Sequence, residues 1–175
     1  VLAIGTSTDP YQPIERDRRI MRRVLRVLSD HGHPVAITTK GTLIERDLDL
    51  LAPMAARGLV HVGLSVTTLD AGVGRAMEPR VPSPARRLLA IRRLAEAGVP
   101  VRVQVAPVVP ALTDHELEAI LAAAAEAGAR AASMIVLRLP REVAGLFREW
   151  LAERFPDRAA RVMAGATTIP NGAGG

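Results

Sequence analysis

The sequence contains no cysteine, which excludes disulfide bonds and leaves no thiolate to ligate a metal ion or a cluster. Aromatic residues make up only 2% of the chain, so a platform of rings for stacking single-stranded bases is not expected. No apolar run approaches the roughly 20 residues of a membrane span, and no signal peptide is recognisable. We therefore expect a cytoplasmic protein that does not enter a membrane.

Apolar residues are plentiful, at 49% of 175 residues, so the chain is long enough to bury one sizeable core. The formal net charge of +5 is compatible with acidic partners such as nucleic acid. Composition alone does not decide between an enzyme and a binding module.

Short β-branched segments alternate five times with amphipathic segments, and a glycine commonly separates a helix from the next strand. We expect strands over residues 1–6, 35–39, 60–67, 101–106 and 132–137. We expect helices over residues 14–31, 43–57, 84–97, 114–127, 141–154 and 157–164. Ser83 and Thr113 are the expected helix N-caps, Thr113 as part of a capping box with Glu116.

Near-continuous apolar strands between helices predict an α/β fold with a parallel sheet covered by helices. An open doubly wound sheet and a partial (β/α) barrel both fit this alternation. The sequence shows no dinucleotide-binding fingerprint, and the first strand has no unit before it, so we favour a partial barrel with five βα units. We expect this domain over residues 1–166, with an open edge at its first strand and a disordered tail over 167–175.

Polar side chains follow several of the expected strands, at the edge where parallel α/β proteins bind ligands. Thr8 and Asp9 follow the first strand, Lys40 follows the second, and Ser65 lies near the end of the third. Lys40 is the only lysine, and its ammonium is suited to hold a carboxylate or phosphate as a point charge. The residues alone leave two alternatives open, a solvent-facing Lys40 and a Ser65 bonded only to backbone.

Other polar groups have ordinary structural explanations as well as functional ones. Glu78 and Arg80 either contact a ligand or hold their own loop. The four histidines lack metal-ligand spacing. A stripe of arginines on the first helix fits either a phosphate backbone or a solvated face, and comprises Arg16, Arg19, Arg22, Arg23 and Arg26.

Several motifs occur in a consistent order over residues 1–163. They are T-D-P-Y-Q-P-x-E (8–15), T-T-K (38–40), L-S-V-T-T-L-D (64–70), E-P-x-x-P-S-x-x-R (78–86) and V-A-P-V-V-P (105–110). Together they resemble the radical S-adenosylmethionine proteins related to spore photoproduct lyase.

The resemblance implies a partial barrel whose strand ends hold S-adenosylmethionine against a 4Fe-4S cluster. One electron from the cluster would cleave the cofactor to a 5′-deoxyadenosyl radical, and the protein would supply placement and exclusion of solvent. It further implies a lyase-like enzyme, with DNA repair as a candidate activity and DNA as a candidate partner.

The resemblance also assigns cofactor-binding positions. Thr8, with Asp9 beside it, matches the place that meets the methionyl amino group. Lys40 and Ser65 match positions that hold the carboxylate and the ribose. The backbone at Ala106 and Pro107 matches the adenine site.

Two departures from the family pattern limit what the resemblance implies. The family holds its cluster with a C-x3-C-x2-C loop, and this chain has no cysteine. We interpret the chain as a fragment that begins one unit late, with a degenerate homologue as the alternative. Spore photoproduct lyases also have a hydrogen-donating cysteine where this chain has Thr6.

Two other functions remain open from the residues alone. One is a cluster-free βα-barrel enzyme that binds a phosphate or a sugar, although residues 137–142 lack the glycine-rich loop expected for phosphate. The other is a non-catalytic module that binds nucleic acid through the arginine stripe.

The absence of thiolates generates the first prediction. Anaerobic incubation of this chain with iron and sulfide should give no cluster absorbance above that of a protein-free control, because all cysteine ligands are absent. A stable, stoichiometric cluster measured by visible absorption and iron analysis would contradict this argument.

Overall fold

The computed structural model describes residues 1–169, and its central element is a five-stranded parallel sheet. The strands are β1 (Leu2–Ile4), β2 (Val35–Thr39), β3 (Val60–Ser65), β4 (Val101–Val108) and β5 (Ala131–Val136). Each strand pairs with the next one along the chain, in the order β1-β2-β3-β4-β5. In a doubly wound sheet the order of the strands reverses at a switch point, so some consecutive strands are not neighbours. The consecutive order therefore confirms the predicted parallel α/β fold of the barrel type.

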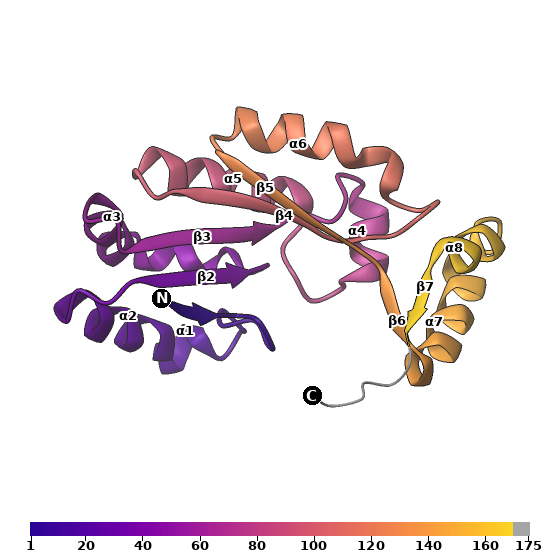
Figure 1. Cartoon of the computed structure of the whole chain (residues 1–175), viewed down its shortest axis with the longest axis horizontal. Coiled ribbons are helices and arrows are strands. Elements are labelled where there is room, and N and C mark those ends of the chain that lie inside the picture. The colour runs from indigo at the N-terminus through magenta and orange to yellow at the C-terminus, as the bar shows by residue number, and fades with distance from the viewer. Residues whose placement is uncertain (170–175) are drawn as a thin grey trace.

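Helices connect the strands, and the longer ones between them lie along the outside of the sheet (Figure 1). They are α1 (Glu15–Arg18), α2 (Ile20–Asp30), η1 (Thr42–Asp47), α3 (Leu48–Ala56), α4 (Ala71–Met77), α5 (Pro84–Glu96), η2 (Asp114–Glu116) and α6 (Leu117–Glu126). Two more helices, α7 (Arg141–Arg154) and α8 (Ala159–Gly165), follow β5. No helix within residues 1–169 is long and apolar enough to cross a membrane.

The larger of the two hydrophobic clusters lies on one face of the sheet. Alternate strand residues such as Ile37, Val62 and Val103 are buried against helix residues that include Leu25 and Ile91. Strand side chains alternate between the two faces. On the opposite face, Thr38 and Gln104 are half-buried and Arg102 is exposed. The helices therefore cover the outer face, as a (β/α) barrel requires, and the inner face is lined by small and polar groups.

The helix predicted over residues 14–31 is interrupted, and Glu15 supplies the reason. Arg19 adopts a left-handed conformation with φ of 50° between α1 and α2. The buried Glu15 carboxylate accepts hydrogen bonds from the backbone N–H groups of Ile20, at 2.8 Å, and Met21, at 3.1 Å. A carboxylate at a helix N-terminus satisfies free donors and interacts favourably with the helix dipole. Glu15 thus starts a new helix where periodicity predicted a continuous one.

Two further local predictions differ from the structure. The loop after β3 contains the unpredicted helix α4, whose N-terminal N–H groups are capped by the side chain of Asp70. Thr113 forms no capping box, because its hydroxyl accepts from Val109 N at 2.9 Å. Glu116 instead accepts from Thr68 Oγ1 at 2.6 Å. The N-cap predicted at Ser83 is confirmed by its contact with the α5 backbone.

The predicted disordered tail begins with a strand. Residues Thr167–Ile169 form β7, which runs parallel to β6 (Arg138–Pro140). One residue, Leu137, separates β5 from β6, and its N–H donates to Val108 O on β4 at 2.8 Å. Strands β6 and β7 form a separate two-stranded sheet that follows β5 along the chain (Figure 1). The remaining tail residues, 170–175, lie outside the described part.

The two outer strands of the main sheet expose apolar side chains. Val1 and Leu2 are 81% and 42% exposed at the β1 edge, which has β2 as its only neighbour in the sheet over residues 1–169. Met134 and Ile135 are 54% and 58% exposed on β5. The predicted open edge at the first strand is confirmed. An unpaired parallel edge with apolar side chains is a surface that proteins normally cover.

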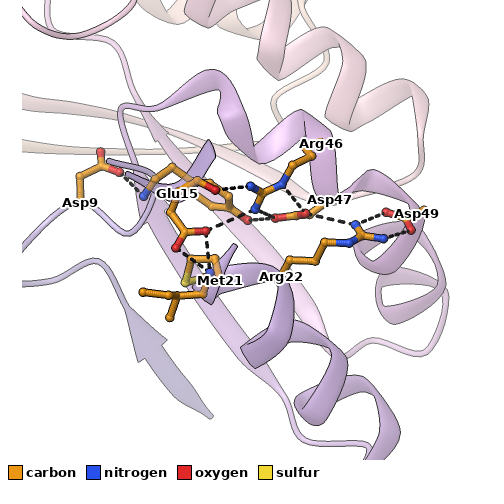
Figure 2. Close-up of polar contacts among 9 residues, drawn as sticks. Asp9, Glu15, Met21, Arg22, Arg46, Asp47 and Asp49 are labelled. Carbon is orange, nitrogen blue, oxygen red and sulfur yellow. Dashed lines mark hydrogen bonds and ion pairs between the residues drawn. The ribbon is translucent and has the colours of Figure 1, made fainter. Parts of the chain in front are cut away.

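A buried charge cluster joins the loop after β1 to η1 (Figure 2). The Asp47 side chain is fully buried and accepts hydrogen bonds from Tyr11 Oη at 3.1 Å and from Arg46 Nε at 2.9 Å. Arg22 Nη1 is a third donor residue to Asp47, at 3.2 Å, and Arg46 Nη1 also donates to the Glu15 backbone carbonyl at 2.6 Å. Burial and the neighbouring Asp47 charge raise the pKa of Tyr11 well above its ordinary value. Much of the T-D-P-Y-Q-P-x-E motif thus stabilises the fold.

We predict that Asp47→Ala lowers the free energy of unfolding by about 3 kcal/mol, because it leaves arginine charges in a buried cluster without their carboxylate. Asp49→Ala is the matched control. It removes an exposed partner of the same Arg22 and should change stability by less than about 1 kcal/mol. Urea unfolding followed by circular dichroism measures both. Equal losses in the two variants would contradict a special contribution from the buried cluster.

Candidate functional site at the carboxyl edge of the sheet

The carboxyl ends of β2 and β3 bring Lys40 and Ser65 to the same edge of the sheet. Lys40 directly follows β2, and Ser65 is the last residue of β3. A third group, Glu78, comes from the loop between α4 and α5. The predicted strand-end positions of Lys40 and Ser65 therefore agree with the fold.

The Lys40 ammonium forms an ion pair with Glu78 Oε1. The other oxygen of Glu78 accepts from Arg87 Nη2 at 2.6 Å and from Thr67 Oγ1 at 3.2 Å. Arg87 is 2% exposed, whereas the Lys40 side chain is 32% exposed. Lys40 is therefore the cation of this group that solvent reaches.

Burial opposes ionisation of Glu78, but the hydrogen bond from Lys40 and the charge of Arg87 outweigh it. The pKa of the Glu78 carboxyl is consequently lower than its ordinary value. The carboxylate is ionised at neutral pH, and both cations keep their partner.

Asp9 is held by three hydrogen bonds from the protein itself. Its carboxylate accepts from the backbone N–H groups of Lys40, at 2.7 Å, and Tyr11, at 2.8 Å, and from Thr39 Oγ1 at 2.7 Å. Both carboxylate oxygens are used in these contacts. Asp9 therefore fixes the loop after β1 against the end of β2, and the neighbouring Thr8 is exposed.

Ser65 is buried, and both its backbone and its side chain have partners. Its carbonyl accepts from Arg87 Nη1 at 3.1 Å, and its hydroxyl lies 3.5 Å from Gln104 Oε1. Gln104 Nε2 lies 3.5 Å from Thr38 Oγ1. A Cβ at Gly63 would lie 3.0 Å from the Gln104 side chain. Glycine at position 63 therefore leaves room for Gln104 on the inner face of the sheet.

Ala106 and Pro107 lie near the carboxyl end of β4, where the pairing with β5 shifts register between Val105 and Val108. The Ala106–Pro107 peptide bond is cis, and both residues are half-buried. Their backbone is thus at the same edge of the sheet as Lys40 and Ser65.

Sequence reasoning missed Arg87 and Gln104, and it left the partner of Glu78 open. Glu78 contacts Lys40 and Arg87, and Arg80 is exposed. The one available signal for Arg87 was its place on the otherwise apolar side of α5, with Ala90, Ile91 and Leu94. A charged residue on an apolar helix face indicates a buried partner.

The residues of this chain do not fit an iron–sulfur cluster. Its sequence has no cysteine, and residues 1–169 contain no group of three or more histidine, aspartate or glutamate side chains arranged to hold a metal ion. Of the predicted arginine stripe on the first helix, Arg22 is bonded to Asp47 and Asp49.

The consecutive parallel strands and the polar carboxyl edge define a βα-barrel protein of the kind that binds a ligand at its strand ends. The model of the Radical SAM superfamily matches residues 1–124, and the chain belongs to that superfamily. Its members normally use S-adenosylmethionine and a 4Fe-4S cluster.

Several proteins are similar in sequence or structure. Rv2578c, an uncharacterized protein of Mycobacterium tuberculosis, is 38% identical over 162 residues, which are 91% of this chain and 48% of the relative. MJ0683, an uncharacterized protein of Methanocaldococcus jannaschii, is 31% identical over 65% of this chain and 42% of its own length. The crystal structure of SuiB from Streptococcus suis has a similar fold, with a TM-score of 0.57, 18% identity and coverage of 89% of this chain and 37% of SuiB. The chain thus spans less than half the length of these proteins.

The carboxylates at the ion pairs generate a prediction about pH. The pKa values of Glu45 and Glu78 are lowered by arginine and lysine partners that outweigh burial, so the unfolded chain binds more protons than the folded one in acid. Their stabilisation should be complete above the ordinary glutamate pKa of about 4.3 and should fall as the pH drops below it.

Thermal unfolding measured between about pH 6 and pH 3 checks this prediction. Glu45→Gln should flatten the acid-side loss of the melting temperature, because it removes one linked proton. Glu153→Gln, at an exposed position on α7, should leave the profile unchanged. An identical acid profile in wild type and Glu45→Gln would exclude Glu45 as a contributor.

Proposed function

We propose that this chain is the part of a radical S-adenosylmethionine enzyme that holds the cofactor at the carboxyl edge of its sheet. The observation that supports the proposal is the partly exposed Lys40 side chain, held at the end of β2 beside the strand that ends in Ser65. When bound and reduced in a complete enzyme, the cofactor supplies a 5′-deoxyadenosyl radical. The residues of this chain bind and orient it.

The proposed roles follow the position of each residue. The Lys40 ammonium binds the methionyl carboxylate, and Thr8 faces the methionyl amino group. The Ser65 hydroxyl contacts the ribose, and the backbone of Ala106 and Pro107 contacts the adenine. Asp9 contributes indirectly in this scheme. Its carboxylate is already bonded to Lys40 N, Thr39 and Tyr11, so it holds the loop after β1 and the start of the Lys40 side chain in place.

The proposal places the cluster ligands outside this sequence. Three observations support it: the chain lacks cysteine, its β1 edge exposes Val1 and Leu2, and its curated relatives are more than twice as long as the regions matched. A further βα unit beside β1 would pair that edge and cover its apolar side chains. The 1–166 domain is on this view part of a larger barrel.

The substrate is not part of the proposal. The resemblance to spore photoproduct lyase suggests DNA repair, and exposed arginines such as Arg16, Arg23 and Arg26 are compatible with a phosphate backbone. Thr6, however, occupies the place of the cysteine that donates hydrogen in that lyase. We therefore propose the cofactor-binding role and not the lyase reaction.

Lys40→Ala should weaken binding of S-adenosylmethionine to this chain by about tenfold to a hundredfold, because a hydrogen bond between charged groups contributes roughly 1.5–3 kcal/mol. Lys40→Arg should restore only part of the affinity, since the wider guanidinium fork needs more space. Isothermal titration calorimetry measures both effects.

Arg92→Ala is the matched control for loss of one positive charge, because Arg92 is exposed on the surface of α5. Its affinity for the cofactor should equal that of wild type. Equal affinity in wild type and Lys40→Ala would remove Lys40 from the site and overturn the proposed function.

A further inference from the structure

The backbone of Lys40 is fixed on the side of β1. Lys40 N donates to Asp9 Oδ2 at 2.7 Å, and Gly41 N donates to Thr39 Oγ1 at 2.8 Å. A Cβ at Gly41 would lie 2.9 Å from Tyr11 Cβ, so the chain passes close to the β1 loop here. These contacts set the point from which the long Lys40 side chain extends.

The tip of the same side chain is fixed from the side of β3. Lys40 Nζ donates to Glu78 Oε1, and Arg87 Nη2 and Thr67 Oγ1 donate to Glu78 Oε2. Arg87 is in turn anchored by the carbonyl of Pro82, at 2.8 Å from Nε, and by the carbonyl of Ser65, at 3.1 Å from Nη1. A chain of contacts thus runs from the end of β3 through a buried guanidinium to the ammonium.

We propose that Glu78 is a positioning residue that orders the Lys40 ammonium for an anionic ligand group, with Arg87 holding Glu78 in place. This inference rests on the proposed function, because the ligand group is the methionyl carboxylate. Glu78 is itself not a ligand-binding residue in this scheme. It acts on the ligand only through Lys40.

The arrangement has a physical advantage over a free lysine. A lysine side chain has a flexible four-carbon stem, and it loses much rotamer freedom when its ammonium binds a ligand. The Glu78 contact restricts that freedom before a ligand arrives, which is preorganisation. An ammonium has three donors, and Glu78 accepts from one of them, so the others are available to a ligand carboxylate.

Because Lys40 is the only lysine in the chain, its order can be measured without a ligand. Protein labelled with ¹³C-lysine gives a single lysine Cε resonance. We expect an ordered, shifted signal in wild type and a narrow random-coil signal in Glu78→Gln. Glu45→Gln is the matched control, because Glu45 binds Arg86 and Arg93 instead of Lys40, and it should leave the resonance unchanged.

The effect on the ligand is tested by a double-mutant cycle with S-adenosylmethionine, measured by calorimetry. Glu78→Gln should weaken binding by about tenfold in the wild-type background and by less than about twofold in the Lys40→Ala background. This coupling is the result that a merely structural Glu78 would not produce. If Glu78→Gln does not fold, Glu78→Asp replaces it in the cycle. Aspartate keeps the charge but is one methylene shorter, so the same loss of affinity is expected.

Three results would overturn the inference while leaving the proposed function intact. They are an unchanged Lys40 resonance in a folded Glu78 variant, an equal loss of affinity in both backgrounds, and tighter binding in Glu78→Gln, which would make Glu78 a competitor for Lys40. Failure of the proposed function is distinct, because then Lys40→Ala alone would leave affinity unchanged.

Discussion

The Glu78 carboxylate, shared between Lys40 and the buried Arg87, is the contact on which the carboxyl edge of the sheet depends. It joins residues from three segments: the end of β2, the loop after α4 and the first turn of α5. Breaking a buried ion pair by removing one partner is costly, because a charge then stays buried without compensation. The geometry around Lys40 is therefore tied to the stability of the neighbouring βα unit.

Similar contacts of a buried or half-buried acidic residue join the other βα units. Asp47 and Glu15 tie the β1 loop to η1, and Glu45 ties η1 to α5 through Arg86 and Arg93. In each case an acidic residue of one unit meets a basic or hydroxyl side chain of the same or an adjacent unit. Because each strand pairs with its neighbour in sequence, such contacts fix the position of successive strand ends. A barrel-like edge that binds a ligand requires this fixed spacing.

Membership of the Radical SAM superfamily and the polar carboxyl edge both support the cofactor site that we propose. The missing cysteines and the exposed edge at β1 are the observations from which we proposed that the cluster ligands lie outside this sequence. The inner face of the sheet, with Thr38, Arg102 and Gln104, is polar in contrast to its outer face. A cofactor-binding body without its own cluster ligands is consistent with both sets of observations.

Local sequence determined the strand sites, the parallel α/β class and the strand-end positions of Lys40 and Ser65, because short apolar runs and glycine helix ends are encoded by neighbouring residues. It did not determine the break at Arg19, the role of Asp9 or the partner of Glu78. The break at Arg19 rests on a local contact, Glu15 with Ile20 N, which apolar periodicity does not report. Asp9 and Glu78 depend on Lys40 N and Arg87, which are brought close to them only when the chain folds. Only the tertiary structure could decide them, because a charged side chain takes the partner that folding places within reach, whatever its distance in sequence.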